Sequence, residues 1–291
     1  MRYLSPLRYP GGKARLAPYL QRLITAQTPR PTHYAEPFAG GAGAALKLLT
    51  DGIVEEIHLN DLNPGIAAFW RSITTAPEEF CELISETEVN LHEWHKQRVT
   101  YLAGETGNDL ALGFATFFLN RTNRSGILHA GPIGGHDQKG KWKIDARYNK
   151  PGLVKRVQAI GRLGNQIHIT QLEGLDFLDS LIPLGTDVFI YADPPYVVQG
   201  DGLYLHAFDE AAHVDLANKL SNTHCPWMLT YDDDPRITDI LYNNVRCARF
   251  PIAHTAHKQH IGTESAIYSD TLTVPDLELT RGHVAEWVTS P

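Results

Sequence analysis

The chain has 291 residues, of which 43% are hydrophobic, and it carries a formal net charge of −7 at pH 7. This length and apolar content suit one large domain, or a domain with an insertion, that buries a sizeable core. The sequence shows no run of about 18 apolar residues and no charged segment followed by an apolar one at its start, so we expect neither a membrane span nor a signal peptide. The three cysteines lack a short metal-ligand spacing, which predicts free thiols in a reducing, cytoplasmic compartment.

Basic residues are concentrated in one part of this acidic chain. Between Arg121 and Arg162 there are ten lysines and arginines against two acids. A local basic stretch on an acidic body is typical of proteins that contact phosphates. A solvated basic face is the alternative.

The N-terminal part carries a glycine pair before a predicted helix. Residues 8–13 read Arg-Tyr-Pro-Gly-Gly-Lys, and a helix is expected over 14–26. The glycines would let the backbone approach a ligand closely, and Lys13 could reach an anionic group. The segment lacks P-loop spacing, and an ordinary loop-to-helix turn is the alternative.

A strand, a glycine-rich turn and a helix come next. The strand is expected at 33–36, the turn at 37–43 and the helix at 44–50, and a second strand at 56–60 ends at Asp61. This order is typical of the first unit of a nucleotide-binding fold. A carboxylate at the end of the second strand can hold ribose hydroxyls. A packing turn in which Asp61 caps the next helix is the alternative.

From residue 64 to 165 the alternation of strands and helices stops. Helices are expected at 66–75, 78–98, 110–119 and 151–163, with loops and a hairpin between 125 and 147. We interpret 64–165 as an inserted, mainly helical unit of domain size.

The insertion contains candidate DNA-contacting side chains. They are Asn120, Arg121, Asn123 and Arg124 at a helix end, followed by Lys139, Lys141 and Lys143 in the basic stretch. Asn and Arg are the side chains that read adenine and guanine edges. The alternative is a polar helix C-terminus whose arginines complement the helix dipole.

The strand pattern resumes at 167–170 and is followed by Asp176 and Phe177. A carboxylate and an aromatic ring at this position could hold the amino group and face of an adenine. A helix cap with a core phenylalanine is about as well supported.

The apolar strand 188–192 leads into Asp193-Pro194-Pro195-Tyr196. In an open α/β sheet, ligands bind at the carboxyl ends of the strands. The two prolines fix two φ angles and hold backbone carbonyls rigid beside a carboxylate and an aromatic face. These acceptors suit the exocyclic amino group of a flipped-out adenine or cytosine. A rigid turn in which Asp193 caps a helix is the alternative.

The C-terminal part predicts a helix at 210–220, a strand at 227–230, a capped helix ending at 242, and two pairing strands at 245–252 and 265–274. Between the last two lie His254, His257 and His260. We favour a loop over a zinc site there, because no carboxylate or cysteine completes a known ligand spacing. No metal is expected.

Five motifs occur together in one order. They are Tyr-Pro-Gly-Gly-Lys at 9–13, Glu-Pro-Phe-Ala-Gly-Gly at 36–41, Asp-Leu-Asn-Pro at 61–64, Asn-Arg at 120–121 and Asp-Pro-Pro-Tyr at 193–196. Together they make the chain resemble the Dam-type DNA N6-adenine methyltransferases, which include phage and restriction-modification members. The resemblance covers residues from about 5 to 275.

This resemblance implies an α/β fold with a Rossmann-like class I methyltransferase sheet, mostly parallel with an antiparallel C-terminal strand. Residues 1–63 and 166–291 would form the S-adenosylmethionine-binding catalytic domain, and 64–165 a helical target-recognition insertion. By position in the motifs, the cofactor contacts would be Tyr9, Lys13, Phe38, Gly40, Asp61 and Asp193. One departure is Ala42, where the family has glycine.

The expected reaction is direct, in-line methyl transfer to N6 of adenine in double-stranded DNA. Asp193 and the Pro194 carbonyl would hold the amino group, Pro195 would stiffen the turn and Tyr196 would stack on the base. Cytosine-N4 or another exocyclic-amine methylation, a non-catalytic DNA-binding homologue and a dinucleotide-dependent dehydrogenase are the alternatives. We expect a bacterial or phage-encoded monomer, or a dimer on DNA.

Overall fold

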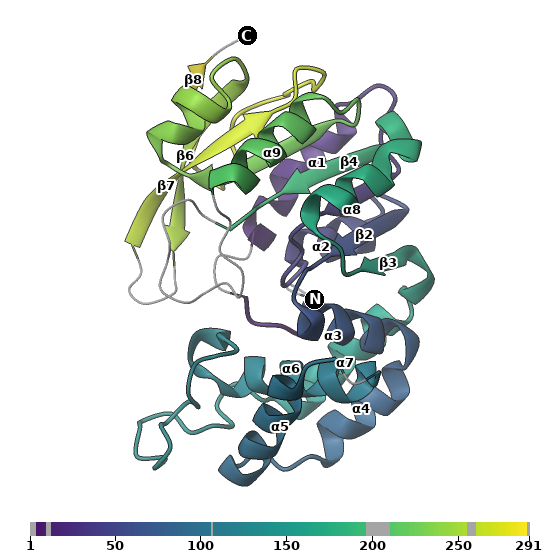
Figure 1. Ribbon diagram of the computed structural model, residues 1–291, viewed down its shortest axis with the longest axis vertical. Helices are drawn as coiled ribbons and strands as arrows, with labels where there is room; N and C mark the ends of the chain where they lie inside the picture. Colours follow the sequence, from purple (N-terminus) through teal and green to yellow (C-terminus); the bar gives the residue numbers. More distant parts are fainter. Residues whose placement is uncertain (1–3, 10–12, 106, 196–209, 255–259, 290–291) are drawn as a thin grey trace.

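The computed structural model describes residues 4–289 except for 10–12, 106, 196–209 and 255–259. An eight-stranded sheet runs through its upper half, in the order β3-β2-β1-β4-β5-β7-β6-β8 (Figure 1). The pairs β3/β2, β2/β1, β1/β4 and β4/β5 are parallel. The remaining pairs, which involve β6, β7 and β8, are antiparallel. The expectation of a Rossmann-like, mostly parallel sheet is therefore confirmed.

The parallel strands are short, and their carboxyl ends lie at the same end of the sheet. They are β1 (His33–Glu36), β2 (Glu56–Asn60), β3 (Ile167–Thr170), β4 (Val188–Ala192) and β5 (Trp227–Asp232). Every residue of β4 is buried, as expected for a central parallel strand with both faces covered. Because the strands are parallel, the residues that follow β1, β2 and β4 emerge at the same edge.

The antiparallel part is a long hairpin with a short edge strand. It consists of β6 (Arg246–His254), β7 (His260–Tyr268) and β8 (Glu286–Thr289). The expected pairing of the last two predicted strands is confirmed, although β7 begins earlier than 265.

Helices cover both faces of the sheet. The 3₁₀ turn Lys13–Leu16 leads into α1 (Ala17–Thr25), and α2 (Gly43–Thr50) follows β1. On the opposite face, α8 (Gly174–Leu181) and α9 (Glu210–Ser221) cover an apolar cluster that includes Ala35, Ile190 and Leu229 (Figure 1).

Residues between β2 and β3 form a helical lobe below the sheet (Figure 1). Its helices are α3 (Pro64–Thr75), α4 (Pro77–Glu86), α5 (Leu91–Ala103), α6 (Asp109–Thr122) and α7 (Lys150–Gly161). Phe69, Phe80, Phe114 and Phe117 form its aromatic centre, with ring centroids 5.4–6.2 Å apart. The single helix expected at 78–98 is two helices, because Asn90 caps α5 through the Glu93 amide at 2.8 Å.

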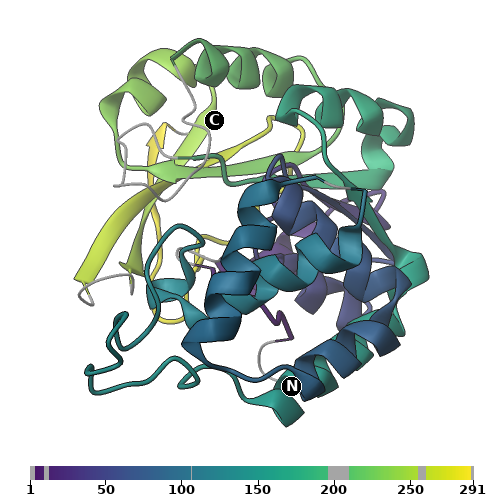
Figure 2. The ribbon, with the colours of Figure 1, turned by 60° about the horizontal axis from the view of Figure 1, so that its bottom comes forward.

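The expected hairpin between 125 and 147 is absent from the described chain. This stretch is a series of turns with one bridge between Asn123 and Pro132. It extends away from the helices in both views, which Figure 2 shows from the side of the helical lobe.

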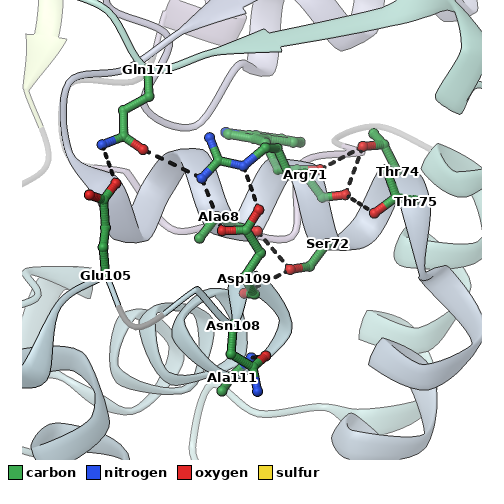
Figure 3. Close-up of polar contacts among 11 residues, drawn as sticks. Ala68, Arg71, Ser72, Thr74, Thr75, Glu105, Asn108, Asp109, Ala111 and Gln171 are labelled. Atoms are coloured by element: carbon green, nitrogen blue, oxygen red, sulfur yellow. Dashed lines mark hydrogen bonds and ion pairs between the residues drawn. The ribbon is translucent and has the colours of Figure 1, made fainter.

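A polar joint fastens the helical lobe to the sheet (Figure 3). The Arg71 guanidinium on α3 donates to both oxygens of Asp109 at the start of α6, at 2.6 and 3.0 Å. It also contacts Gln171 just after β3, whose amide donates to Glu105. The joint therefore ties two insertion helices to the edge of the sheet. Among the described residues, no helix is long and apolar enough to cross a bilayer.

Candidate active site

Three motif segments meet where β1, β2 and β4 end. They contain Pro37 after β1, Asp61 after β2 and Asp193 after β4. Asn60, which is 1% exposed, ties this edge together because its amide nitrogen donates to the carbonyls of Pro37 and Leu172, each at 3.0 Å. The glycine-rich turn, Asp61 and Asp193 therefore lie at the carboxyl ends of neighbouring parallel strands.

The glycine-rich turn packs closely against Tyr9. A Cβ at Gly40 would lie 2.7 Å from the Tyr9 ring, and Gly40 has a φ of +46°. Both observations require glycine there. Ala42, the departure from the family pattern, also adopts a left-handed conformation with φ 45°. Ala42 thus adopts a backbone conformation that glycine would adopt more easily, which strains the backbone locally.

Asp61 organises the same turn. Its carboxylate accepts from the Gly40 amide and from the Asn63 amide, each at 2.9 Å. Burial raises the pKa of Asp61 to about 6, although these two backbone donors act to lower it. The side chain nevertheless stays partly exposed, so it can still meet a ligand at the sheet edge.

The aromatic candidates after β1 and β3 differ in position. The Phe38 ring packs against the first residue of α8, because a Cβ added at Gly174 would lie 3.0 Å from it. Asp176, in the first turn of α8, is exposed. Phe177 is 1% exposed and packs in the apolar cluster under α8. Its ring faces the core, as in the alternative of a core phenylalanine, and we leave it out of the proposed cofactor contacts.

The Asp193 carboxylate is held by a buried network. The Lys13 ammonium lies 3.0 Å from Asp193 Oδ1 and 3.2 Å from Glu264 Oε1. Thr230 Oγ1 donates to the same Asp193 oxygen at 2.9 Å. Burial acts to lower the pKa of Lys13, but Asp193 and Glu264 outweigh it and raise that pKa, so Lys13 remains a cation.

The other oxygen of Asp193, Oδ2, makes no hydrogen bond or ion pair with the described residues, and the side chain is 23% exposed. Pro194 is buried and Pro195 partly buried, whereas Tyr196 lies outside the described residues. The site therefore offers one oriented carboxylate oxygen at the carboxyl end of β4.

Two of the predicted DNA contacts, Asn120 and Asn123, are buried and bonded within the protein. The Asn120 amide accepts from the Arg8 amide at 2.7 Å and donates to the carbonyls of Arg8 and Gly126. Asn123 accepts from the Trp94 indole at 2.7 Å and donates to the Ile127 and Leu128 carbonyls. In this geometry both amides face the interior, and we leave them out of the proposed DNA contacts.

Replacing Asn120 with Ala is expected to lower the free energy of unfolding by about 2–3 kcal/mol, because buried backbone groups of Arg8 and Gly126 lose their partner. Urea denaturation of the purified protein would measure the change. Asn149→Ala, which removes only the exposed cap of α7, is the control and should lose at most about 1 kcal/mol. An unchanged unfolding midpoint for Asn120→Ala would contradict the structural role.

The other DNA candidates lie on exposed loops. Arg124, Lys139, Lys141 and Lys143 are all exposed, and Lys141 lies 5.7 Å from the centre of the 63%-exposed Trp142 ring. An exposed aromatic among cations is typical of nucleic-acid surfaces.

Arg121 belongs to a group of four neighbouring arginines, here called the arginine cluster: Arg8, Arg121, Arg147 and Arg156. The side chains of Arg8, Arg121 and Arg156 donate to backbone carbonyls, including Arg121 to Pro6 and Arg147, and Arg156 to Ser5. No described carboxylate lies within ion-pair distance of the cluster. Burial, and then the neighbouring arginines, lowers the pKa of Arg121.

The comparison with known protein families gives a match over most of the chain. Residues 9–261 match the family described as D12 class N6 adenine-specific DNA methyltransferase. The chain belongs to this family. The match confirms the resemblance drawn from the five motifs, and the mixed sheet is consistent with a class I methyltransferase fold.

One similar solved structure is that of protein LPL1258 from Legionella pneumophila str. Philadelphia 1. It is 14% identical, the alignment covers 92% of this chain and 89% of that chain, and the TM-score is 0.37.

Two residues that position Asp193 were not predicted from the sequence. Glu264 on β7 and Thr230 on β5 both contact the Lys13–Asp193 pair. Glu264 is 1% exposed, and a buried carboxylate needs a partner. Its neighbours Thr263 and Ser265 are polar, so the sequence around it does not signal this burial, and a lone threonine in a strand is no signal for Thr230.

Proposed function

We propose that this D12 family member transfers the methyl group of S-adenosylmethionine to N6 of adenine in double-stranded DNA. The observation that carries the proposal is the Asp193 carboxylate, with Oδ1 fixed by Lys13 and Thr230 and Oδ2 without a polar partner among the described residues. An acceptor with one fixed and one accessible oxygen suits an amino group that must be oriented before it reacts.

The cofactor would lie along the ends of β1 and β2. Asp61 would accept from the ribose hydroxyls, the turn at Phe38 and Gly40 would border the cofactor, and Tyr9 would support that turn. The exposed Asp176 would accept from the adenine amino group. Lys13 would act through Asp193, which its ammonium contacts directly. When bound, the cofactor supplies an electrophilic methyl group.

The target base would reach this edge by flipping out of the duplex. Its amino hydrogens would be held by Asp193 Oδ2 and the Pro194 carbonyl, while Pro195 keeps the turn rigid. Tyr196 would stack on the ring. The acceptors would draw the nitrogen lone pair out of ring conjugation and aim it at the methyl carbon, so the protein contributes mainly by positioning. N6 would exchange one hydrogen for the methyl group, with S-adenosylhomocysteine as the leaving group and the amino proton released to solvent.

The helical lobe, residues 64–165, would hold the DNA. Four cations of the arginine cluster lie together without a described carboxylate, and a phosphate would offset their repulsion. Arg124 and the lysines at 139, 141 and 143 would extend this contact along the backbone. We propose a cytoplasmic monomer that acts on duplex DNA.

Arg147→Gln and Arg156→Gln are each expected to weaken binding to any duplex sequence. Removing one phosphate contact should reduce the slope of log K against log salt by about 1. Fluorescence anisotropy between low and moderate salt would measure it. Arg281→Gln, an exposed arginine near the C-terminus, is the matched control and should keep the slope. Equal slopes for all variants would reject the arginine cluster as a DNA contact.

Cofactor binding is expected to weaken as the pH falls through about 6, because the Asp61 carboxylate then takes up a proton and becomes a weaker acceptor for the ribose hydroxyls. The affinity at pH 5 should be about tenfold lower than at pH 7.5. Because the folded pKa lies above the ordinary 3.8, protonation between these values favours the folded state, so this titration does not by itself unfold the protein. Calorimetry with S-adenosylhomocysteine would test it. Asp61→Asn should bind weakly at every pH, and a pH-dependent affinity in that variant would assign the effect to another group.

The reaction itself is tested by incubating the protein with unmethylated plasmid DNA and methyl-labelled S-adenosylmethionine. Nucleoside mass spectrometry should find N6-methyladenine, and single-molecule sequencing of the plasmid should give its context. N4-methylcytosine would favour the cytosine-directed alternative. Cofactor binding without methylation of any base would favour a non-catalytic DNA-binding homologue.

A further inference from the structure

A second polar cluster lies on the sheet, apart from the site above. His33, Glu56 and His58 each offer one ligand atom, and these atoms all lie within 4.8 Å of one another. His33 Nδ1 is 3.1 Å from His58 Nε2 and 3.9 Å from Glu56 Oε2. None of the three belongs to the motifs that define the family resemblance.

Strand register brings the cluster to one face of the sheet. His33 pairs with Glu56, and Ala35 pairs with His58, across β1 and β2. Glu56 and His58 are two residues apart, so both point to the same face as His33. The small Ala35 beside His58 leaves room for the two imidazoles.

A third histidine orients the carboxylate. His168 on β3 pairs in register with His58, and its ring stacks on the His58 ring at 4.7 Å. Its Nε2 lies 2.5 Å from Glu56 Oε2. A hydrogen-bonded carboxylate beside imidazoles is the usual arrangement around a protein-bound metal ion.

The spacing fits a transition metal. Zinc–nitrogen bonds of about 2.0–2.1 Å in a tetrahedron separate the ligand atoms by about 3.3 Å. The two recorded separations are 3.1 and 3.9 Å and the third is at most 4.8 Å, so side-chain shifts of roughly 1.5 Å or less would reach this value. Two imidazoles and a carboxylate, with a fourth position open to water, form a known zinc ligand set.

We propose that His33 Nδ1, Glu56 Oε2 and His58 Nε2 bind one divalent transition-metal ion of the zinc class, with His168 positioning Glu56. The ion would link β1 and β2 near their start, on the side of the sheet that α8 covers. Asp61 follows His58 by three residues, or about 10 Å of strand. The ion therefore stabilises the strands that carry the cofactor turn and takes no part in the methyl transfer.

The test is titration of the full-length, metal-free protein with Zn²⁺, together with the absorption spectrum of the Co²⁺ form. We expect one equivalent to bind, a tetrahedral Co²⁺ spectrum and a rise in Tm. His33→Ala and Glu56→Gln should each weaken Zn²⁺ binding by at least about 100-fold. His58→Ala should do the same, and the variants at the partly exposed His33 and Glu56 keep the test decisive if His58→Ala does not fold.

Two controls separate this site from other histidines. His92→Ala removes an exposed histidine on α5, and the double variant His257→Ala with His260→Ala removes two of the three histidines found between positions 254 and 260 of the sequence. Both variants should still bind one equivalent of Zn²⁺ as tightly as the wild type. The proposal is overturned if Zn²⁺ does not bind, if binding survives in His33→Ala and Glu56→Gln, or if it disappears in the double variant. None of these outcomes depends on methyltransferase activity.

Discussion

Asp193→Ala is expected to lower the rate of methyl transfer by at least about 10²–10³-fold, because the amino group loses the carboxylate that orients it. The fold should persist, since Lys13 keeps Glu264 at 3.2 Å as a partner. A labelled-methyl assay with duplex DNA measures the rate, and circular dichroism with thermal unfolding reports the fold.

Asp193→Asn provides the sharper comparison, since it keeps the shape and one acceptor oxygen but removes the charge. We expect activity between that of the wild type and that of Asp193→Ala, with cofactor affinity close to the wild-type value. Full activity in Asp193→Ala would remove this carboxylate from the mechanism. Lost cofactor binding would instead show that Asp193 acts mainly on the cofactor.

Lys13→Met should reduce both stability and activity. The Lys13 side chain is 4% exposed and contacts two carboxylates, one of them the 1%-exposed Glu264. Removing one partner of a buried ion pair costs about 3–5 kcal/mol, so the unfolding midpoint should fall sharply. Asp193 would also lose the contact that fixes Oδ1. Urea denaturation and the labelled-methyl assay would measure the two effects separately.

The double variant Lys13→Met with Glu264→Gln separates these two roles. Replacing the buried carboxylate should recover part of the lost stability, while methyl transfer stays low because Asp193 remains without its cation. Lys47→Met, on an exposed pair of α2, should change the free energy of unfolding by less than about 1 kcal/mol. Activity restored together with stability would show that Lys13 serves the fold alone.

The sequence was most informative at the strand ends. The positions of Asp61 and Asp193 could be predicted because each follows a predicted strand, and residues that follow parallel strands lie at the carboxyl end of the sheet. The glycine turn was predictable for the same reason. The conformation of Ala42 was not, because alanine shows no preference for a left-handed φ.

Side-chain roles were harder to predict than positions. Asn120 and Phe177 have the chemistry to contact a ligand, yet burial directs both towards the protein. Sequence spacing does not reveal which face of a helix is covered by a distant segment. In α6, the backbone of Arg8 covers Asn120. Glu264 was missed for the related reason that its partner, Lys13, lies 251 residues away.

The described residues of segment 4–9 join the two halves of the molecule. The carbonyls of Ser5, Pro6 and Arg8 accept from Arg156, Arg121 and Asn120 of the helical lobe, and Tyr9 then packs on the Gly40 turn. The lobe is therefore not a detachable module. A chimaera that exchanges 64–165 between relatives must therefore also exchange residues 4–9, because otherwise the contacts between this segment and the helical lobe are lost.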